Sequence, residues 1–269
     1  MTALAPRLPT HAAETIRTFL RAHASGPGVE GAVVGLSGGI DSALTLRLLR
    51  DALGAERVLG VLLPDDAFPA ALLVETEGFS RSLGVAHRTV AIGPVEAAYH
   101  RTLPELTDQV ARGNLKARIR MTLLYAIARE RKAVVVGTGN KSELLLGYFT
   151  KYGDGGADLL PIGDLYKTEV RELAAQLELP AAIQERVPTA GLWEGQTDEG
   201  ELGLDYPSID RILRGLEELR DEPEISRLTG LPPEVVHRIA ERVVRFRHKR
   251  RSPPIPKVGL RTIGIDWRD

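Results

Sequence analysis

The stretch that most constrains this chain is residues 32–53, AVVGLSGGIDSALTLRLLRDAL. It begins with a short apolar run that contains two β-branched valines and is typical of a buried strand. Two adjacent glycines follow, and then a leucine-rich segment on a good helix-forming background. The pattern predicts a strand, a tight turn and a helix. Adjacent glycines allow backbone N–H groups to point into a concavity that also faces the positive end of the helix, so we expect the turn to bind phosphate.

The residue types in this turn distinguish it from the phosphate loop of kinases. The kinase-type motif places a lysine against the terminal phosphates, whereas GLSGGIDS has no lysine and carries Asp41. A carboxylate beside a polyphosphate is repelled unless Mg²⁺ lies between them. We therefore interpret Asp41 as a metal ligand, and Ser37, Ser42 and the glycine amides as the phosphate cradle. The alternative is a Gly-Gly turn in which Ser37 or Asp41 only caps a helix.

Composition limits the class of protein. The chain has 269 residues, of which 43% are hydrophobic and 26% are charged, and we expect one globular domain over residues 1–269. A formal net charge of −1 argues against a nucleic-acid partner. No apolar run suits a membrane span or a signal peptide, so we expect no membrane partner and a cytoplasmic location. Cysteine is absent, which excludes disulfides, thiolate metal sites and cysteine nucleophiles.

Apolar runs and amphipathic segments alternate along the chain. This alternation predicts an α/β fold in which a parallel sheet has helices on both faces. We expect irregular loops at 148–163 and 187–207, where glycine and aspartate or proline are frequent. Strands are predicted at 32–36, 58–63, 87–92 and 133–137, and helices at 11–24, 41–53, 69–83, 104–132, 168–179, 208–219 and 232–248.

A second glycine-rich strand exit, GTGNKSE, follows the fourth predicted strand. Sites in parallel sheets form at the carboxyl ends of strands, where the strand order reverses. Asn140 and Glu143 have the spacing of a helix capping box. They also permit a functional interpretation, in which Glu143 is a second carboxylate on the Mg²⁺ held by Asp41 and Thr138 lines a nucleotide pocket. The sequence leaves both interpretations open.

Several motifs, taken in order, resemble one enzyme family. GLSGGIDS is similar to the signature of the PP-loop ATP pyrophosphatases, which cleave ATP to AMP and pyrophosphate while they activate a carboxylate or carbonyl oxygen. The later motifs resemble the ammonia-dependent NAD synthetases, and the similarity covers most of the chain. These motifs are NLKARIRM at 114–121, GTGNKSE at 137–143, GYFTKYGDGGADLLPIGDLYKTEV at 147–170, PTAGLWEGQTDE at 188–199 and HKR at 248–250.

The resemblance implies an adenine nucleotide alpha hydrolase-like (PP-loop) fold and a ligase that amidates deamido-NAD to NAD with ammonia. ATP cleavage would drive the reaction through an NAD-adenylate, with Mg²⁺ on Asp41 and Glu143. The family is dimeric, so a homodimer is implied. Candidate catalytic groups are Lys167, for charge on the pyrophosphate, and Asp154 or Asp158, for the ammonium proton. ATP contacts are implied for Gly35, Leu36, Ser37, Gly38, Gly39, Ile40, Asp41, Ser42, Thr138, Lys167 and Thr189, and deamido-NAD contacts for Arg118, Lys151, Asp158, His248 and Lys249.

Less specific interpretations remain for some of these residues. Arg118 and His248 could be solvated helix charges, and Lys167 could pair with Asp164 three residues before it. Other functions are a different PP-loop ATP pyrophosphatase, such as a tRNA-modifying ligase or a GMP synthetase-like enzyme, or a non-catalytic nucleotide-binding module. A tRNA enzyme should show a basic surface, a thiolating enzyme needs cysteine, and a binding module would not need paired carboxylates.

The absence of cysteine generates a prediction about the nitrogen source. Glutamine-dependent relatives carry an amidase domain with a cysteine nucleophile, and this chain has no cysteine. We predict that ammonium supports turnover of the isolated chain and that glutamine does not. The measurement is pyrophosphate release in the presence of ATP, Mg²⁺ and deamido-NAD, with either nitrogen source. Efficient use of glutamine by this chain would refute the prediction.

Overall fold

Four parallel strands form a single sheet in the computed structural model, which describes residues 4–193 and 195–263. The strand order is β3-β2-β1-β4, and β1 pairs with both β2 and β4, so the order reverses at β1. The prediction of an α/β fold with a parallel sheet is confirmed. The strands are β1 (Gly31–Gly35), β2 (Val58–Leu62), β3 (Ala86–Thr89) and β4 (Ala133–Val136).

Both faces of the sheet are buried, because successive side chains of a strand point to opposite faces. In β1, Val33 packs on one side and Val34 on the other, and in β4 the side chains of Val135 and Val136 divide in the same way. This explains why β1, β2 and β4 are apolar throughout instead of alternating between apolar and polar residues. The edge strand β3 is different, because it contains His87, Arg88 and Thr89 and is largely exposed.

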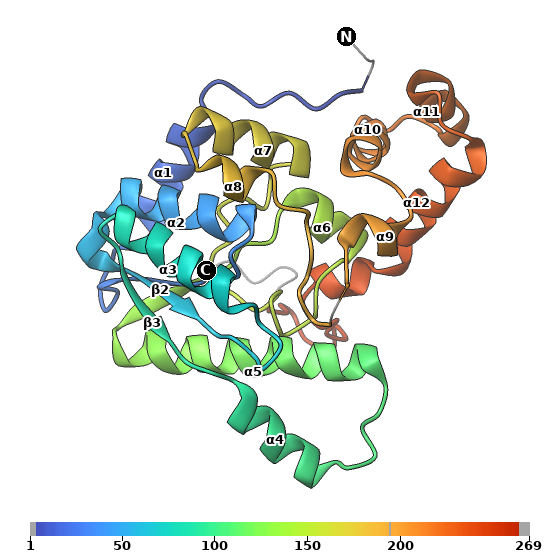
Figure 1. Cartoon of the computed structure of the whole chain (residues 1–269). Helices are drawn as coiled ribbons and strands as arrows, with labels where there is room; N and C mark the ends of the chain where they lie inside the picture. The colour runs from blue at the N-terminus through green and yellow to red at the C-terminus, as the bar shows by residue number, and fades with distance from the viewer. Residues whose placement is uncertain (1–3, 194, 264–269) are drawn as a thin grey trace.

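Helices cover the two faces (Figure 1). Among the described residues, the apolar core on one face of the sheet includes residues of five helices, and the core on the other face includes residues of two. The five are α1 (Ala12–His23), α2 (Ile40–Leu53), α3 (Ala70–Ser82), α7 (Lys167–Gln176) and α8 (Ala181–Gln184), and the two are α4 (Gly93–Thr102) and α5 (Gln109–Glu130). The longer of these two helices, α5, lies beneath the sheet in Figure 1.

A third group of helices lies beside the sheet and has its own apolar core (Figure 1). Tyr206, which is fully buried, is one of the largest side chains in this core. None of the helices in the described residues is long and apolar enough to cross a membrane. The group contains α6 (Lys141–Leu146), α9 (Asp198–Leu202), α10 (Tyr206–Glu217), α11 (Glu222–Thr229) and α12 (Pro233–Arg245), and the short 3-10 helix η2 (Arg247–Arg250) follows it.

Several element predictions need correction. The long helix begins at Gln109 instead of near 104, because the Asp108 side chain accepts a hydrogen bond from Ala111 N (2.7 Å) and caps it. Residues 93–102, for which we predicted no element, form α4. The third strand ends at Thr89, before the predicted 92. The sequence also did not reveal α6, α8, α9 and α11, because helices of one or two turns are too short to show a 3.6-residue period.

Gly31 and Gly78 allow a test of the packing around β1. A Cβ atom at Gly31 would lie 2.1 Å from the carbonyl oxygen of Arg57, whereas a Cβ atom at Gly78, in α3, would have no neighbour within 4 Å. We expect Gly31→Ala to lower the free energy of unfolding by about 2 kcal/mol or more, because backbone atoms must move apart. Gly78→Ala should raise it by roughly 0.5–1 kcal/mol through helix propensity. Urea unfolding followed by circular dichroism measures both, and a Gly31→Ala chain as stable as the wild type would contradict this packing.

Candidate active site

The carboxyl ends of β1 and β4 are neighbours at the point where the strand order reverses. β1 leads into GLSGGIDS and β4 leads into GTGNKSE, and the two strands pair in register from Gly31 with Ala133 to Val34 with Val136. The two glycine-rich exits therefore lie next to each other, where parallel sheets commonly open a crevice for a ligand.

Serine side chains hold the turn after β1. Ser42 Oγ donates to the carbonyl oxygen of Gly39 (3.0 Å) and lies 3.2 Å from Ser37 Oγ. Gly39 N donates to Ser37 Oγ (3.2 Å). Gly38 has φ +80°, and a Cβ atom there would lie 2.5 Å from the side chain of Leu72 in α3. The turn thus requires glycine at position 38 and keeps its backbone amides at the start of α2.

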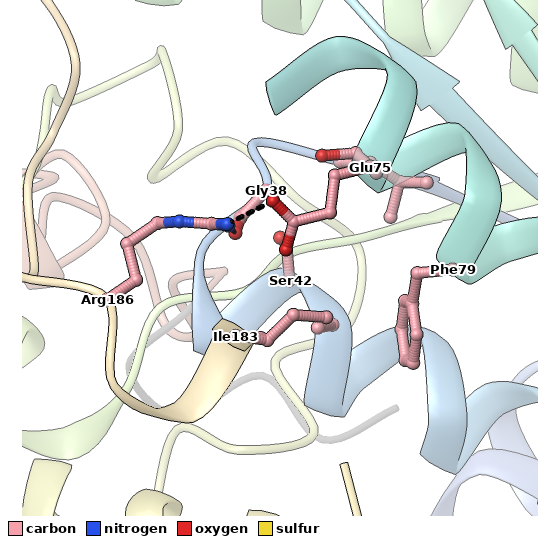
Figure 2. Close-up of a pocket in the computed structure, with 9 residues that line it drawn as sticks. Gly38, Ser42, Glu75, Phe79, Ile183 and Arg186 are labelled. Carbon is pink, nitrogen blue, oxygen red and sulfur yellow. Dashed lines mark hydrogen bonds and ion pairs between the residues drawn. The ribbon is translucent and has the colours of Figure 1, made fainter. Parts of the chain in front are cut away.

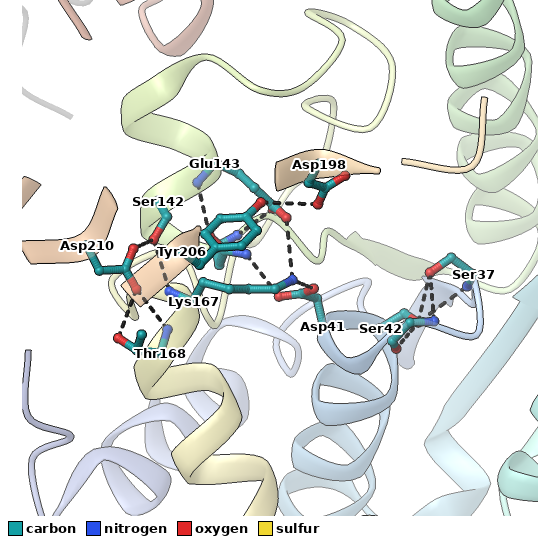
Figure 3. Close-up of polar contacts among 12 residues, drawn as sticks. Ser37, Asp41, Ser42, Ser142, Glu143, Lys167, Thr168, Asp198, Tyr206 and Asp210 are labelled. Carbon is teal, nitrogen blue, oxygen red and sulfur yellow. Dashed lines mark hydrogen bonds and ion pairs between the residues drawn. The ribbon is translucent and has the colours of Figure 1, made fainter. Parts of the chain in front are cut away.

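Asp41 binds residues of two other helices instead of capping its own (Figure 3). Its Oδ2 pairs with the ammonium of Lys167, and its Oδ1 accepts a hydrogen bond from Asn140 Nδ2 (3.0 Å). Gly39 is the N-cap residue of α2, and no side chain caps that end. The interpretation of Asp41 as a helix cap is therefore wrong, and Asp41 connects α2 to α6 and α7.

Lys167 is the first residue of α7, and it is 2% exposed. Its Nζ lies 3.9 Å from Glu143 Oε1, in addition to its contact with Asp41. Burial favours the neutral amine, but the two carboxylates outweigh burial and raise the pKa of Lys167. Lys167 does not pair with Asp164, because Asp164 lies 3.0 Å from Lys141 Nζ instead. The lysine is therefore a buried cation between two acidic side chains.

Glu143 caps α6, as one interpretation of its motif predicted, and it also faces Lys167. Its Oε2 accepts a hydrogen bond from Asn140 N (3.1 Å), and its own N–H donates to Asn140 Oδ1 (3.0 Å), which completes the capping box of α6. Its other oxygen faces Lys167. Burial, together with the nearby Asp41 carboxylate, raises the pKa of Glu143 well above its usual value. Capping therefore uses one carboxylate oxygen and leaves the other directed at the buried ammonium.

A third carboxylate, which our sequence reasoning missed, belongs to the same cluster. Asp198, at the start of α9, is 4% exposed and accepts a hydrogen bond from Tyr206 OH (3.1 Å). Its Oδ1 is buried without a hydrogen-bond partner, and burial raises the pKa of Asp198. The Tyr206 ring lies 5.4 Å from Lys167 Nζ. The signal that could have identified Asp198 is its place in the motif at 188–199.

A fourth carboxylate, also missed, joins the helices that carry Glu143 and Lys167 (Figure 3). Asp210 in α10 is fully buried and accepts hydrogen bonds from Ser142 Oγ (2.5 Å), Thr168 N (2.9 Å) and Thr168 Oγ1 (2.8 Å). Ser142 Oγ in turn accepts from Lys167 N (2.9 Å). Asp210 therefore satisfies the N–H of Thr168 directly and that of Lys167 through Ser142, and it sets α6 against α7, although it lies far from both in the sequence.

The two aspartates of the GDGGAD loop are both bound to the protein. Asp158 Oδ2 accepts a hydrogen bond from Val135 N (2.8 Å), and its Oδ1 accepts from Tyr125 OH (3.0 Å). These contacts fasten the loop to β4 and α5. Asp154 is exposed, and its Oδ1 accepts a hydrogen bond from Thr150 N (2.8 Å).

Three of the residues expected to hold deamido-NAD are neighbours. Arg118, exposed on α5, makes a long contact of 3.4 Å with the carbonyl oxygen of Lys151. Lys151 Nζ donates to the carbonyl oxygen of His248 (2.9 Å). These contacts bring α5, the loop after α6 and η2 together, and the side chains of Arg118 and His248 are exposed there.

Lys249, expected at the same substrate, holds protein backbone instead. Together with Arg242 and Arg250 it binds the carboxyl end of α6, where carbonyl groups have no partner within the helix. The favourable charge of a cation at that end adds to these hydrogen bonds. The donors and acceptors are Arg250 to the carbonyl oxygen of Leu145 (3.1 Å), Arg242 to that of Leu146 (3.1 Å), and Lys249 to that of Gly147 (2.7 Å).

The remaining residues expected to contact ATP contribute in different ways. Leu36 and Ile40 are 5% and 4% exposed, so their side chains belong to the core and only their backbone can face a ligand. Gly35 ends β1, and Thr138 lies half-buried in the exit of β4. Thr189 is exposed, and its hydroxyl accepts a backbone N–H two residues later (3.1 Å).

Asp41 and Glu143 suit a divalent cation as a pair of carboxylate ligands, without a complete set of protein ligands around the ion. Within residues 4–193 and 195–263, no three Asp, Glu or His side chains are placed to hold a metal ion. Mg²⁺ does not need such a set, since it usually takes one or two carboxylates together with water and phosphate oxygens. Asp41 and Glu143 lie beside the ammonium of Lys167, Asp198 adds negative charge nearby, and one buried oxygen of Asp198 has no hydrogen-bond partner. This excess of negative charge suits an added cation.

Comparisons with known proteins identify a family. A family model described as NAD synthase matches residues 12–253. The NH(3)-dependent NAD(+) synthetase of Methanosarcina acetivorans is 48% identical over 89% of this chain and 95% of its own length. A solved NMN synthetase from Francisella tularensis has a TM-score of 0.82 at 33% identity, covering 94% of this chain and 100% of that one. For the NH3-dependent NAD synthetase of Campylobacter jejuni, the TM-score is 0.77 at 32% identity, with 91% and 98% covered.

Asp210 generates a prediction about stability. We expect Asp210→Asn to lower the free energy of unfolding by about 3 kcal/mol, because the buried donors of Ser142 and Thr168 lose a charged acceptor. The matched control is Asp221→Asn, at the exposed N-cap of α11, where Asp221 accepts from Glu224 N (2.8 Å). Asparagine is an equally good N-cap, so this change should cost less than about 0.5 kcal/mol. Equal losses in urea unfolding would contradict the role assigned to Asp210.

Proposed function

This chain belongs to the NAD synthase family, and from that premise we propose that it amidates deamido-NAD to NAD with ammonia, driven by cleavage of ATP to AMP and pyrophosphate. The observation that carries the proposal is the buried Lys167, which lies between Asp41 and Glu143 beside a glycine-rich turn at a helix N-terminus. This arrangement combines an anion-binding turn, a cation and two candidate metal ligands, which are the groups that ATP cleavage requires.

The reaction explains why ATP is needed. A nicotinate carboxylate is a poor target for ammonia, because the attack would have to expel oxide. In the first step a carboxylate oxygen bonds to the α-phosphorus of ATP, and pyrophosphate leaves. In the second step ammonia attacks the carbonyl carbon of the resulting NAD-adenylate, AMP leaves, and the nitrogen gives up a proton.

We assign the ATP phosphates to the turn at 37–42, with Thr138 and Thr189 as further ATP contacts. The backbone N–H groups of the turn and the Lys167 ammonium would stabilise the charge that moves onto pyrophosphate, in a site where fixed dipoles act more strongly than water. Asp41 and Glu143 would hold Mg²⁺, which supplies Lewis-acid stabilisation of phosphate oxygens. The fit rests on the excess of carboxylates around Lys167.

For the ammonium proton we favour Asp154 over Asp158. Both oxygens of Asp158 accept hydrogen bonds from the protein, from Val135 N and Tyr125 OH. Asp154 is exposed and accepts from Thr150 N through Oδ1, so its carboxylate is accessible to an ammonium ion.

We place deamido-NAD near Arg118, Lys151 and His248, which come together from three elements. Lys249 would act there indirectly, by holding the backbone at 147 and 149.

We further propose that the chain forms a homodimer with the dinucleotide near α5, that residues 1–269 form one domain, and that the protein is cytoplasmic. The location of Arg118 on α5 supports the position of the dinucleotide.

The experiment that tests the proposed function is a pyrophosphate-release assay with ATP, Mg²⁺ and ammonium. Deamido-NAD and the corresponding deamidated mononucleotide are compared, because one solved relative is named for NMN synthesis. We expect the dinucleotide to be preferred, in line with the greater identity to relatives named NAD synthetase. Release that does not depend on deamido-NAD would overturn the proposal in favour of another PP-loop enzyme, and no release at all would favour a binding module.

The two proposed metal ligands generate a further prediction. We expect Asp41→Asn and Glu143→Gln each to slow pyrophosphate release roughly 100-fold and to raise the Mg²⁺ concentration that gives half the maximal rate, because a neutral amide holds the cation poorly beside anionic phosphates. Binding of deamido-NAD alone should survive both changes. The measurement is the rate of release against Mg²⁺ concentration.

Glu169→Gln is the matched control for this experiment. Glu169 is also a buried capping-box glutamate, since its Oε2 accepts a hydrogen bond from Tyr166 N (2.9 Å) at the start of α7. If Glu143 only caps α6, both glutamine variants should retain near-normal rates and lose about 1 kcal/mol of stability. Similar rates and an unshifted metal dependence in Glu143→Gln and Glu169→Gln would remove Glu143 from the mechanism.

A further inference from the structure

Two successive carbonyl groups in the phosphate turn are held by different parts of the molecule. The Gly39 carbonyl oxygen accepts a hydrogen bond from Ser42 Oγ (3.0 Å), so the motif itself binds it. The Gly38 carbonyl oxygen accepts from Arg186 Nη1, which lies 148 residues away in the sequence. Arg186 follows α8 and begins the segment that leads to Thr189.

The Arg186 guanidinium is itself fixed in place (Figure 2). Its Nη2 pairs with Glu75 Oε2 (2.6 Å) on α3, so one planar group bridges a carboxylate and a backbone carbonyl. A small pocket lies between Arg186 and the apolar side chains that anchor this region, among them Phe79 and Ile183, which are 9% and 4% exposed. The Arg186 guanidinium is therefore held by a region of the chain that packs into the apolar core.

The bond to the Gly38 carbonyl also determines where the next N–H points. A trans peptide is planar, and its N–H points opposite to its C=O. Because Arg186 holds the Gly38 carbonyl on one side of the turn, Gly39 N–H must point to the other side, where it donates to Ser37 Oγ (3.2 Å). Gly38 has no side chain to resist rotation, and a Cβ atom at this position would lie 2.5 Å from the side chain of Leu72 in α3.

We propose that Arg186 is a positioning residue for ATP, which fixes the Gly38–Gly39 peptide so that its N–H faces the phosphate cradle. This inference rests on the proposed function. The guanidinium also draws electron density toward the carbonyl oxygen of that peptide, which leaves its N–H more positive and makes it a stronger donor to an anion. The same side chain ties the segment that carries Thr189 to the turn.

The test is binding of ATP with Mg²⁺, measured by calorimetry without deamido-NAD, so that no turnover occurs. We expect Arg186→Ala to weaken ATP binding roughly tenfold, the effect of losing one hydrogen bond from a charged donor. Arg186→Lys keeps the positive charge but loses the planar group that binds Gly38 and Glu75 through two nitrogens. Its ATP affinity should therefore lie between that of the wild type and that of Arg186→Ala. In steady-state assays Arg186→Ala should raise KM for ATP and leave KM for deamido-NAD unchanged.

Arg47 provides a matched control in the same molecule. Its guanidinium also bridges a backbone carbonyl and a carboxylate, those of Leu177 (3.0 Å) and Asp51 (2.9 Å), but it lies farther along α2. Arg47→Ala should therefore cost stability without changing ATP affinity by more than about twofold. Wild-type ATP affinity in Arg186→Ala or Arg186→Lys, or equal losses in Arg186→Ala and Arg47→Ala, would overturn the assignment. If the wild-type chain binds ATP but does not release pyrophosphate with deamido-NAD, the proposed function fails and the role of Arg186 in ATP binding still stands.

Discussion

The rest of the site depends on the burial of one ammonium group. Lys167 has almost no contact with water, and a buried charge is tolerated only beside opposite charge. Asp41 and Glu143 supply that charge from two different helices, and Asp198 adds to it from a third. The dependence is mutual, because the same ammonium allows three acidic side chains to remain close together. One cation therefore holds the starts of α2 and α6 beside the start of α7.

The network behind this cluster comes from the third group of helices, not from the sheet. Asp210 reaches α6 and α7 from α10, and it binds them through the residues that adjoin Glu143 and Lys167. The sheet positions the phosphate turn, because β1 leads into it. The third group of helices, which has its own apolar core, positions the acidic residues that face the turn. Their relative position is set by buried polar contacts, which are more directional than apolar packing.

The sheet and the phosphate turn could be predicted from the sequence because both are local patterns. A buried strand followed by two glycines and an amphipathic helix needs only neighbouring residues to form. The partners of charged side chains could not be predicted in this way. Asp41 and Lys167 are 126 residues apart, and Asp164, the nearer candidate, pairs with Lys141. Lys249 shows the same limit, because a motif indicates that a lysine is present but not that its ammonium binds backbone carbonyls.

The short helix α6 has a consequence for how the protein is made. It spans six residues and includes Glu143, and its carboxyl end is held by Arg242, Lys249 and Arg250, between 96 and 105 residues later in the chain. A helix this short has little stability of its own. During synthesis on the ribosome, the phosphate turn emerges early, but Glu143 cannot be held in place until residue 250 has emerged. The two halves of the site are therefore completed at different times during translation.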